Sequence, residues 1–234
     1  MQPRPCFLLA IEVFDNLPQD RIRFAANGEL LQGMVITNDD ARYAEEQKRY
    51  TQVFIPATDK LIIETVNALD AIGHKWPSLR GTVIDAFQSI WPLTAFNFER
   101  PWQSEFIPTG PYHFFKVLRD YFPNSAFLMT DFDALPDTLP GHGAPVVQTR
   151  YKGETVACSS YLLQRGLFDI FFPINFATSR ALLDHLKGGP PGRVQKHSDF
   201  CKKNMDFQKT TTRSGYNPML EDFRNVSFLY KAGP

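Results

Sequence analysis

The sequence has few cysteines and no long hydrophobic run. Cys6, Cys158 and Cys201 are the only cysteines, and none of them is paired at a spacing typical of metal sites. We therefore expect reduced, structural cysteines in an intracellular protein, and no bound metal. No apolar run is long enough to span a bilayer, and the first residues lack the apolar core of a signal peptide. A membrane span is thus not expected.

An excess of charge of either sign is also missing. Lys and Arg together number 25, and Asp and Glu together number 25. A balanced chain has no overall electrostatic attraction to nucleic acid or to an anionic membrane surface. Nucleic acid is therefore not expected as a partner. The length of 234 residues suits one globular domain, or one domain with a subdomain.

Signature motifs of common enzyme classes are absent as well. The sequence contains no nucleophile-elbow serine, no Walker loop and no zincin helix. The glycine pair in Gly141-His142-Gly143 lacks the third glycine of a phosphate-binding loop, and Pro145 prevents a helix from starting at once. Nothing here supports a hydrolase or a nucleoside triphosphatase.

The most informative segment is the first predicted strand. Cys6–Ile11 is apolar and breaks at once into a polar segment that holds Glu12, Asp15 and Asn16. This pattern is typical of a buried parallel strand that delivers polar groups at its carboxyl end. In open α/β sheets, ligands bind at that end of the strands. We predict an interior strand of such a sheet, with a site at Glu12 and Asp15.

Hydrophobic periodicity and turn residues predict the remaining elements. The predicted strands are 20–24, 30–36, 126–130, 146–151, 154–157, 168–173 and 194–196, the first two joined by an Asn27-Gly28 turn and the fourth and fifth by Lys152-Gly153. The predicted helices are 61–72, 112–122, 176–186 and one that begins with Ser198 as its N-cap. Residues 38–49 indicate a solvated insertion, and 76–108 indicate irregular structure with a short helix. A helix followed by a strand over 112–130 favours a parallel βαβ arrangement.

Each acidic candidate has a structural alternative. Glu12 and Asp15 could orient a cationic substrate or contact a cofactor, and the alternative is that Asp15 or Asn16 caps a helix or turn that follows. Asp131 and Asp133 occupy the equivalent place after the strand 126–130, as ligand-binding groups or as caps and loop acceptors.

The other candidates carry alternatives too. Arg150 could clamp a carboxylate or form a surface ion pair. A lone histidine such as His197 is more often structural than catalytic. The aromatic clusters at 91–98 and 168–172 are most simply core.

Five segments in collinear order resemble the MidA-like methyltransferases, the mitochondrial protein-arginine methyltransferases that assist assembly of respiratory complex I. The segment Glu12-Val13-Phe14-Asp15-Asn16-Leu17-Pro18 resembles the E-F-F-D-A-L-P signature of that family. The other four segments are 126–133, 148–153, 168–176 and 196–200, which are similar to the family's A-D-Y-G, T-x-R-G/C-Y, D-x-T-A-D-V-D-F and Q-H-x-x-F-L motifs. Asn217-Pro218-Met219-Leu220 resembles a tail of fungal members.

The resemblance implies a fold and a chemistry. It implies a Rossmann-like class I α/β sheet of order 3-2-1-4-5-7-6, in which Cys6–Ile11 is the fourth strand, so that the chain holds strands four to seven plus insertions. It implies S-adenosylmethionine as methyl donor and an arginine as acceptor. Glu12 and Asp15 would be catalytic and orient the guanidinium through bidentate hydrogen bonds. The implied substrate-binding residues are Asn16, Asp131, Arg150, Tyr151 and His197.

The sequence departs from the family pattern in what precedes the first strand. The glycine-rich turn after strand one and the acidic residue after strand two, which hold the donor, have no counterpart. We therefore expect residues 1–234 to be a partial methyltransferase domain, N-terminally truncated, with an insertion at roughly 38–108. Its cofactor-binding residues are not identified, and the first strand would form an apolar edge.

Two functions from different classes follow. The first is a S-adenosylmethionine-dependent protein-arginine methyltransferase acting on a subunit of respiratory complex I, in the mitochondrion by resemblance alone. The second is a catalytically incomplete, non-enzymatic binding or assembly module derived from that fold. A weaker third option is another α/β enzyme that uses Glu12 and Asp15 as acid–base groups.

Overall fold

The structure, a computed structural model, describes residues 6–25, 27–38, 49–76 and 104–233. Most of the predicted insertion at 38–49 lies outside these residues. The predicted short helix within 76–108 and the aromatic cluster at 91–98 cannot be compared with the structure for the same reason.

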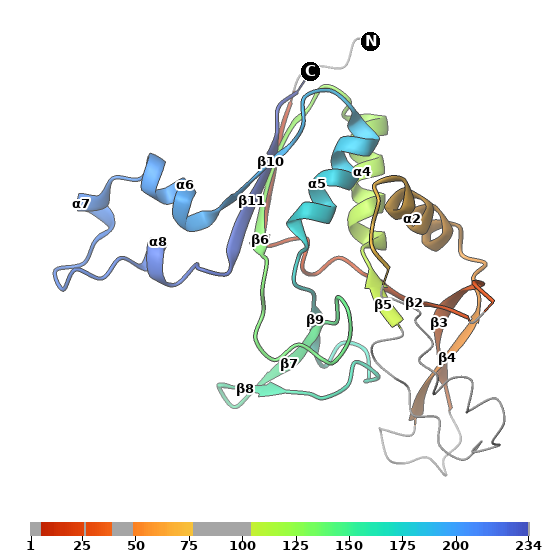
Figure 1. The fold of residues 1–234 in the computed structure, drawn as a ribbon. Helices are drawn as coiled ribbons and strands as arrows, with labels where there is room; N and C mark the ends of the chain where they lie inside the picture. The colour runs from red at the N-terminus through yellow and green to blue at the C-terminus, as the bar shows by residue number, and fades with distance from the viewer. Residues whose placement is uncertain (1–5, 26, 39–48, 77–103, 234) are drawn as a thin grey trace, which may run out of the picture.

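A four-stranded mixed sheet lies at the centre of the molecule (Figure 1). Its order is β1 (Phe7–Ile11), β6 (Ala126–Phe132), β11 (Val226–Lys231) and β10 (Arg193–Lys196). β1 and β6 are parallel, whereas β11 runs antiparallel to both of its neighbours. This order and these directions confirm the 4-5-7-6 half of the implied α/β sheet.

Helices cover one face of this sheet. α4 (Thr109–Tyr121) and α5 (Phe176–Lys187) lie along the face, and α2 (Lys60–Ala71) packs beside them (Figure 1). Their apolar stripes meet alternate residues of the strands, because successive side chains of a strand point to opposite faces. The resulting core is centred on the fully buried side chains of Phe14, Phe115, Phe127, Leu182 and Leu229.

Two smaller antiparallel sheets lie beyond the carboxyl ends of β1 and β6 (Figure 1). The first has the order β4 (Tyr50–Pro56), β3 (Leu30–Thr37), β2 (Asp20–Phe24) and β5 (Ser104–Ile107). The second has the order β8 (Glu154–Ala157), β7 (Val146–Tyr151) and β9 (Asp169–Phe171). Both predicted hairpins are confirmed. β4 and β5 were not predicted, and they pair with β3 and β2 to complete the first sheet.

Three short helices, α6 (His197–Asn204), α7 (Phe207–Thr210) and α8 (Pro218–Glu221), project from the end of β10 (Figure 1). Ser198 is not the N-cap of α6, because the helix already begins at His197 and Lys196 occupies the cap position without a side-chain bond. β11 follows this extension and was not predicted. Among the helices of the described residues, none has the length and apolar character needed to cross a membrane.

Two strand predictions were wrong about burial. β1 is an edge strand of the described sheet rather than an interior one, and Phe7, Leu9 and Ile11 are 55–63% exposed. Ala10 is the buried residue of β1, because it faces the core, whereas Phe7, Leu9 and Ile11 on the opposite face are left exposed by the described residues. The segment 168–173 forms only the short strand β9, in a small sheet where Ile170 is 38% exposed.

Candidate functional site

The loop between β1 and β2, residues 12–19, carries the predicted acidic site and is called the acidic loop below. It leaves β1 at Glu12, whose N–H donates to the carbonyl of Thr130 at 3.0 Å. Glu12 has φ +50°, in the left-handed region that is unfavourable for residues other than glycine. Such strain in a non-glycine residue occurs preferentially at functional sites. No helix follows the loop, so neither Asp15 nor Asn16 caps one; both lie in a turn that closes with the N–H of Leu17 donating to the carbonyl of Phe14 at 3.1 Å.

Asp131 holds the acidic loop in place. It lies within β6, and its Oδ2 accepts the backbone N–H groups of Phe14 at 2.9 Å and Asp15 at 3.2 Å. Its Oδ1 accepts the N–H of Phe132 at 2.8 Å. The side chain is 1% exposed. The structure therefore places Asp131 behind the loop, as a group that orients Asp15 rather than one that faces a ligand.

Asp15 and Asp131 form a pair of buried carboxyl groups. The pKa of Asp131 is raised to about 6, chiefly by burial and also by the nearby charge of Asp15, against the opposing effect of the backbone N–H groups. Burial also raises the pKa of Asp15, and the charge of Glu12 adds to this effect. The hydrogen bond from Asn16 Nδ2 to Asp15 Oδ1, 2.7 Å long, opposes it. Within the part of the chain that the structure describes, no Lys, Arg or His forms an ion pair with either carboxyl.

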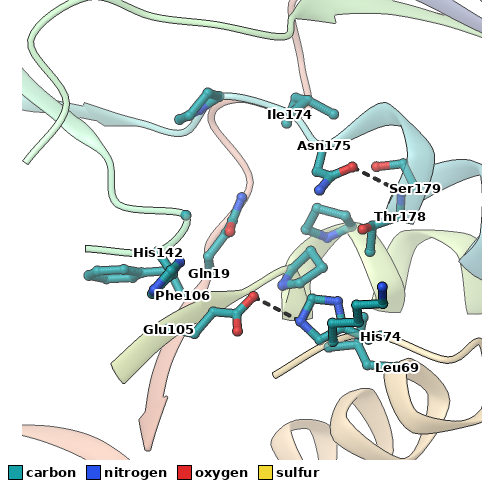
Figure 2. Close-up of a pocket in the computed structure, with 15 residues that line it drawn as sticks. Gln19, Leu69, His74, Glu105, Phe106, His142, Ile174, Asn175, Thr178 and Ser179 are labelled. Carbon is teal, nitrogen blue, oxygen red and sulfur yellow. Dashed lines mark hydrogen bonds and ion pairs between the residues drawn. The ribbon is translucent and has the colours of Figure 1, made fainter. Parts of the chain in front are cut away.

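A cavity of about 310 Å³ opens beside the acidic loop, between the start of α4, the start of α5 and the end of α2 (Figure 2). Gln19 of the loop forms part of its wall. His74 and Glu105 face each other across one side, with His74 Nε2 3.0 Å from Glu105 Oε1. Asn175 caps α5 by accepting the N–H of Thr178 at 3.1 Å. The second oxygen of Glu105, Oε2, is buried and has no hydrogen-bond partner among the described residues.

The cavity and the acidic loop share one wall, the segment 172–175 that leads into α5. The N–H of Phe172 donates to the carbonyl of Asp15 at 2.9 Å, and that of Ile174 donates to the carbonyl of Phe132 at 2.8 Å. Pro173, Ile174 and Asn175 then line the cavity. Gly143 lines it from the other side, where a Cβ would lie 2.8 Å from the carbonyl oxygen of Phe106. The two sites are therefore built on the same backbone.

Three predicted site residues lie away from this cavity. Arg150 and Tyr151 end β7 at an exposed hairpin, and Tyr151 is 62% exposed. His197 is the first residue of α6 and is buried against Phe228, with ring centroids 5.5 Å apart and the planes nearly parallel. Burial lowers the pKa of His197, as expected for a structural histidine.

The remaining acidic and amide candidates, Asp133 and Asn16, lie in different parts of the structure. Asp133 accepts hydrogen bonds from Lys196 and Ser227, so it links β6 to β10 and β11. Asn16 is exposed in the acidic loop next to Asp15. The structure thus brings together Glu12, Asp15, Asn16 and Asp131 and leaves the other candidates outside.

Sequence reasoning missed His74, Glu105 and Gln19 as possible ligand-binding residues. His74 follows the end of α2 and Glu105 lies in β5, and the fold brings these two residues together although they are 31 positions apart in the sequence. Glu105 stands within a stretch that we expected to be irregular. The sequence offered one signal for His74, which is Gly73 at the end of a predicted helix. A glycine there lets the chain turn away from the helix axis, so that His74 no longer follows the helix. The described residues contain no cluster of three or more His, Cys, Asp or Glu side chains that could hold a metal ion.

Two solved structures from Burkholderia thailandensis have a similar fold. One is described as a "likely methyl transferase" bound to S-adenosyl-homocysteine, with a TM-score of 0.51 and 10% sequence identity. The other, an uncharacterized protein of the same superfamily, has a TM-score of 0.50 and 10% identity. The alignments cover 98% of this chain but only 54% and 56% of the solved chains, so this chain spans about half their length. At this identity, the likeness concerns the fold.

A search of curated proteins gave no match. Residues 1–188, however, match a family model described as "Putative S-adenosyl-L-methionine-dependent methyltransferase". The match covers the central parallel strands, the acidic loop and every residue that lines the cavity. The chain therefore belongs to this family of S-adenosyl-L-methionine-dependent methyltransferases.

Proposed function

We propose that this protein acts in transfer of a methyl group from S-adenosylmethionine to a guanidine nitrogen of a protein arginine. The observation that carries the proposal is the carboxyl group of Asp15 at the end of β1, with the buried carboxyl of Asp131 behind it. Among the described residues neither carboxyl pairs with a cation, so a positively charged ligand at Asp15 would offset the repulsion between the two groups. A guanidinium is such a cation, and its planar donors match a carboxylate in bidentate geometry.

The residues of the acidic loop would perform the positioning. Glu12 and Asp15 would accept N–H groups of the guanidinium and hold one nitrogen toward the donor. The donor, when bound, supplies an electrophilic methyl group, so the chain needs to provide orientation and charge rather than a strong base. Asp131 fixes the backbone of Phe14 and Asp15, which keeps the loop rigid during this step.

The residues of this chain fit one side of a methyl-transfer site, the side of the acceptor. The acidic loop offers carboxyl groups at the carboxyl end of β1, where ligands of open α/β sheets bind. The family match and the S-adenosyl-homocysteine bound to one Burkholderia structure support this donor. We assign no residue of this chain to the ribose or the adenine of the donor.

The resemblance of the five sequence segments also supports a biological setting. We propose a subunit of respiratory complex I as the acceptor and the mitochondrion as the location. A tagged copy of the chain should then fractionate with mitochondria and copurify with complex I subunits. Recovery in another compartment would contradict the setting without affecting the proposed chemistry.

One observation favours a second candidate, a non-enzymatic binding or assembly module. Among the described residues, no strand pairs with the outer edge of β1, the side on which the family fold places three further strands. Such a module would recognise the basic acceptor protein through the acidic loop. It would bind the acceptor without transferring a methyl group.

The test is methyl transfer from tritiated S-adenosylmethionine to peptides that differ only by arginine or lysine at one position. We expect label on arginine, identified as methylarginine after hydrolysis. Glu12→Gly should reduce transfer by at least about 100-fold, a typical effect for a positioned catalytic carboxyl group. It should also stabilise the fold by about 1 kcal/mol, because glycine adopts φ +50° without strain.

Lys152→Gly is the matched control. Lys152 also has φ +50°, but it lies in the hairpin between β7 and β8. It should gain the same stability and keep full activity. Equal activity of the Glu12→Gly variant would remove Glu12 from the mechanism. Absence of both methyl transfer and calorimetric binding of S-adenosyl-homocysteine would overturn the methyltransferase proposal for this chain in favour of the binding module.

A further inference from the structure

We propose that the cavity between His74, Glu105 and Asn175 is a second recognition site, which binds a basic side chain of a partner protein. Its ligand would be an alkyl chain ending in a guanidinium or ammonium group. The cavity is distinct from the acidic loop, where the methyl acceptor is proposed to bind. Its use in selecting a substrate rests on the proposed function, whereas binding of a basic side chain does not.

The charge of the cavity is carried by Glu105. Its side chain is 16% exposed, and Oε1 lies 3.0 Å from His74 Nε2. Oε2 is buried without a partner among the described residues. Leaving a buried acceptor unpaired costs about 1–3 kcal/mol, and more when the group is charged. The terminal torsion of a glutamate is broad, so a small rotation presents this oxygen to a donor in the cavity.

The size and walls of the cavity select the kind of ligand. Its volume of about 310 Å³ is at the lower end of small-molecule sites, which suits one side chain rather than a nucleoside-bearing cofactor. Leu69, Pro108, Pro111 and Ile174 give it apolar walls along which an alkyl stem can lie. Carbonyl and hydroxyl oxygens on Asn175, Thr178 and Ser179 offer further acceptors for N–H groups.

The His74–Glu105 pair is held in place before any ligand binds. The ring of His74 packs edge-on against Trp76, with centroids 4.6 Å apart. Trp76 Nε1 donates to Asp70 Oδ1 at 2.6 Å, and Phe24 packs against the same indole at 5.2 Å. Because these contacts hold His74, the residue that pairs with the Glu105 carboxylate, little conformational entropy is lost when a ligand binds.

Lys75 is the one lysine that lines the cavity in the described structure, and it is exposed. No ion pair joins it to Glu105 among the described residues. Its long side chain can keep its charge in water, so it weakens attraction of a cation without filling the site. Removing the charge of Lys75 should therefore strengthen binding of a cation, whereas removing the charge of Glu105 should weaken it.

The test is NMR titration of the isotope-labelled 234-residue chain with capped single-residue probes. These are the N-acetyl methylamides of arginine, lysine and citrulline. Citrulline has nearly the shape of arginine and no charge. We expect arginine and lysine probes to shift the backbone amides of Gly143, Asn175 and Ser179, and citrulline to bind at least about 10-fold more weakly. The arginine probe should also shift Asp15 and Asn16 if the acidic loop binds guanidinium.

Variants separate the two sites without any measurement of methyl transfer. Glu105→Gln should weaken the shifts at the cavity at least about 10-fold and leave those at Asp15 and Asn16 unchanged. Asp15→Asn should do the reverse. Lys75→Gln should tighten binding at the cavity a few-fold, and Glu154→Gln, at an exposed position of β8, should change neither site.

Three results would overturn the proposal. They are equal binding of arginine and citrulline probes at the cavity, unchanged cavity shifts in Glu105→Gln, and no cavity shifts with any probe while the protein gives a folded spectrum. A protein that binds the probes at the cavity yet transfers no methyl group would contradict the proposed function alone.

Discussion

Asp131 illustrates how burial changes the role of a carboxyl group at the residue scale. Its position just after an apolar segment is the same pattern that drew attention to Asp15, and both resemble ligand-binding positions in sequence. In the structure, Asp131 accepts three backbone N–H groups and is 1% exposed. Asp15 is held by that scaffold at the end of β1. The difference between a positioning residue and a catalytic candidate is thus set by burial and by the backbone groups that each carboxyl contacts.

The raised pKa of Asp131 predicts how stability depends on pH. Its pKa is about 6 in the folded protein, above the ordinary value of 3.8, so the folded state binds the proton more tightly than the unfolded state. Its contribution to the free energy of unfolding therefore falls as pH rises from about 4 to 6, by about 1–3 kcal/mol. Asp131→Asn removes this titration. We expect the stability of the wild type relative to the variant to fall by that amount between pH 4 and 7 in urea denaturation.

Asp120→Asn is the control for this measurement. Asp120 is exposed and its pKa is lowered by hydrogen bonds from Arg119, so its contribution is lost only as pH falls below about 4 and is nearly constant from pH 4 to 7. A stability difference between the wild type and Asp131→Asn that stays constant from pH 4 to 7 would show that Asp131 titrates normally.

At the scale of elements, the end of the acidic loop is held by its contact with the first turn of α4. The N–H of Gly110, in the first turn of α4, donates to the carbonyl of Pro18 at 2.8 Å. A Cβ on Gly110 would lie 2.6 Å from that carbonyl oxygen and 2.9 Å from Pro18 Cδ. Only glycine permits this approach, so the end of the loop and the start of the helix are fixed together.

Gly110→Ala should therefore separate the loop from the helix. We expect a loss of about 1–3 kcal/mol in the free energy of unfolding, the usual range for a side chain inserted into a packed contact. Thermal unfolding and urea denaturation measure it. His113→Ala, at an exposed position of the same helix, should change stability by less than about 0.5 kcal/mol. Equal stability of the two variants would mean that the loop moves aside without cost.

The sequence predicted elements better than it predicted contacts between them. α2, α4 and α5 were found because each buries an amphipathic face, and the turns at Gly28 and Gly153 fixed two hairpins. β5 was missed because four residues give too little periodicity. The pairing of Glu105 with His74 could not be predicted, since it depends on how α2 packs against a strand more than 30 residues away.

At the scale of the whole molecule, the two faces of the central sheet are unequal. One face is covered by α4 and α5, whereas Phe7, Leu9 and Ile11 on the other face of β1 are more than half exposed. Antiparallel sheets tolerate an uncovered face, but a parallel pair such as β1 and β6 is usually covered on both. β1 also lies at the edge of the described sheet, which corrects the prediction of an interior strand and leaves its apolar side chains exposed.

An apolar edge strand is a template for association, and one substitution can test whether β1 acts as one. Leu9→Lys places a charge on the exposed face, so it should reduce self-association of the 234-residue chain and leave its stability within about 0.5 kcal/mol. Leu8→Lys, one residue earlier, puts the same charge against the core and should destabilise the fold by at least about 2 kcal/mol, because side chains of a strand alternate between faces. Sedimentation velocity over a range of concentrations, with urea denaturation of each variant, measures both effects. If the Leu9→Lys variant associates as the wild type does, the contact lies elsewhere on the surface.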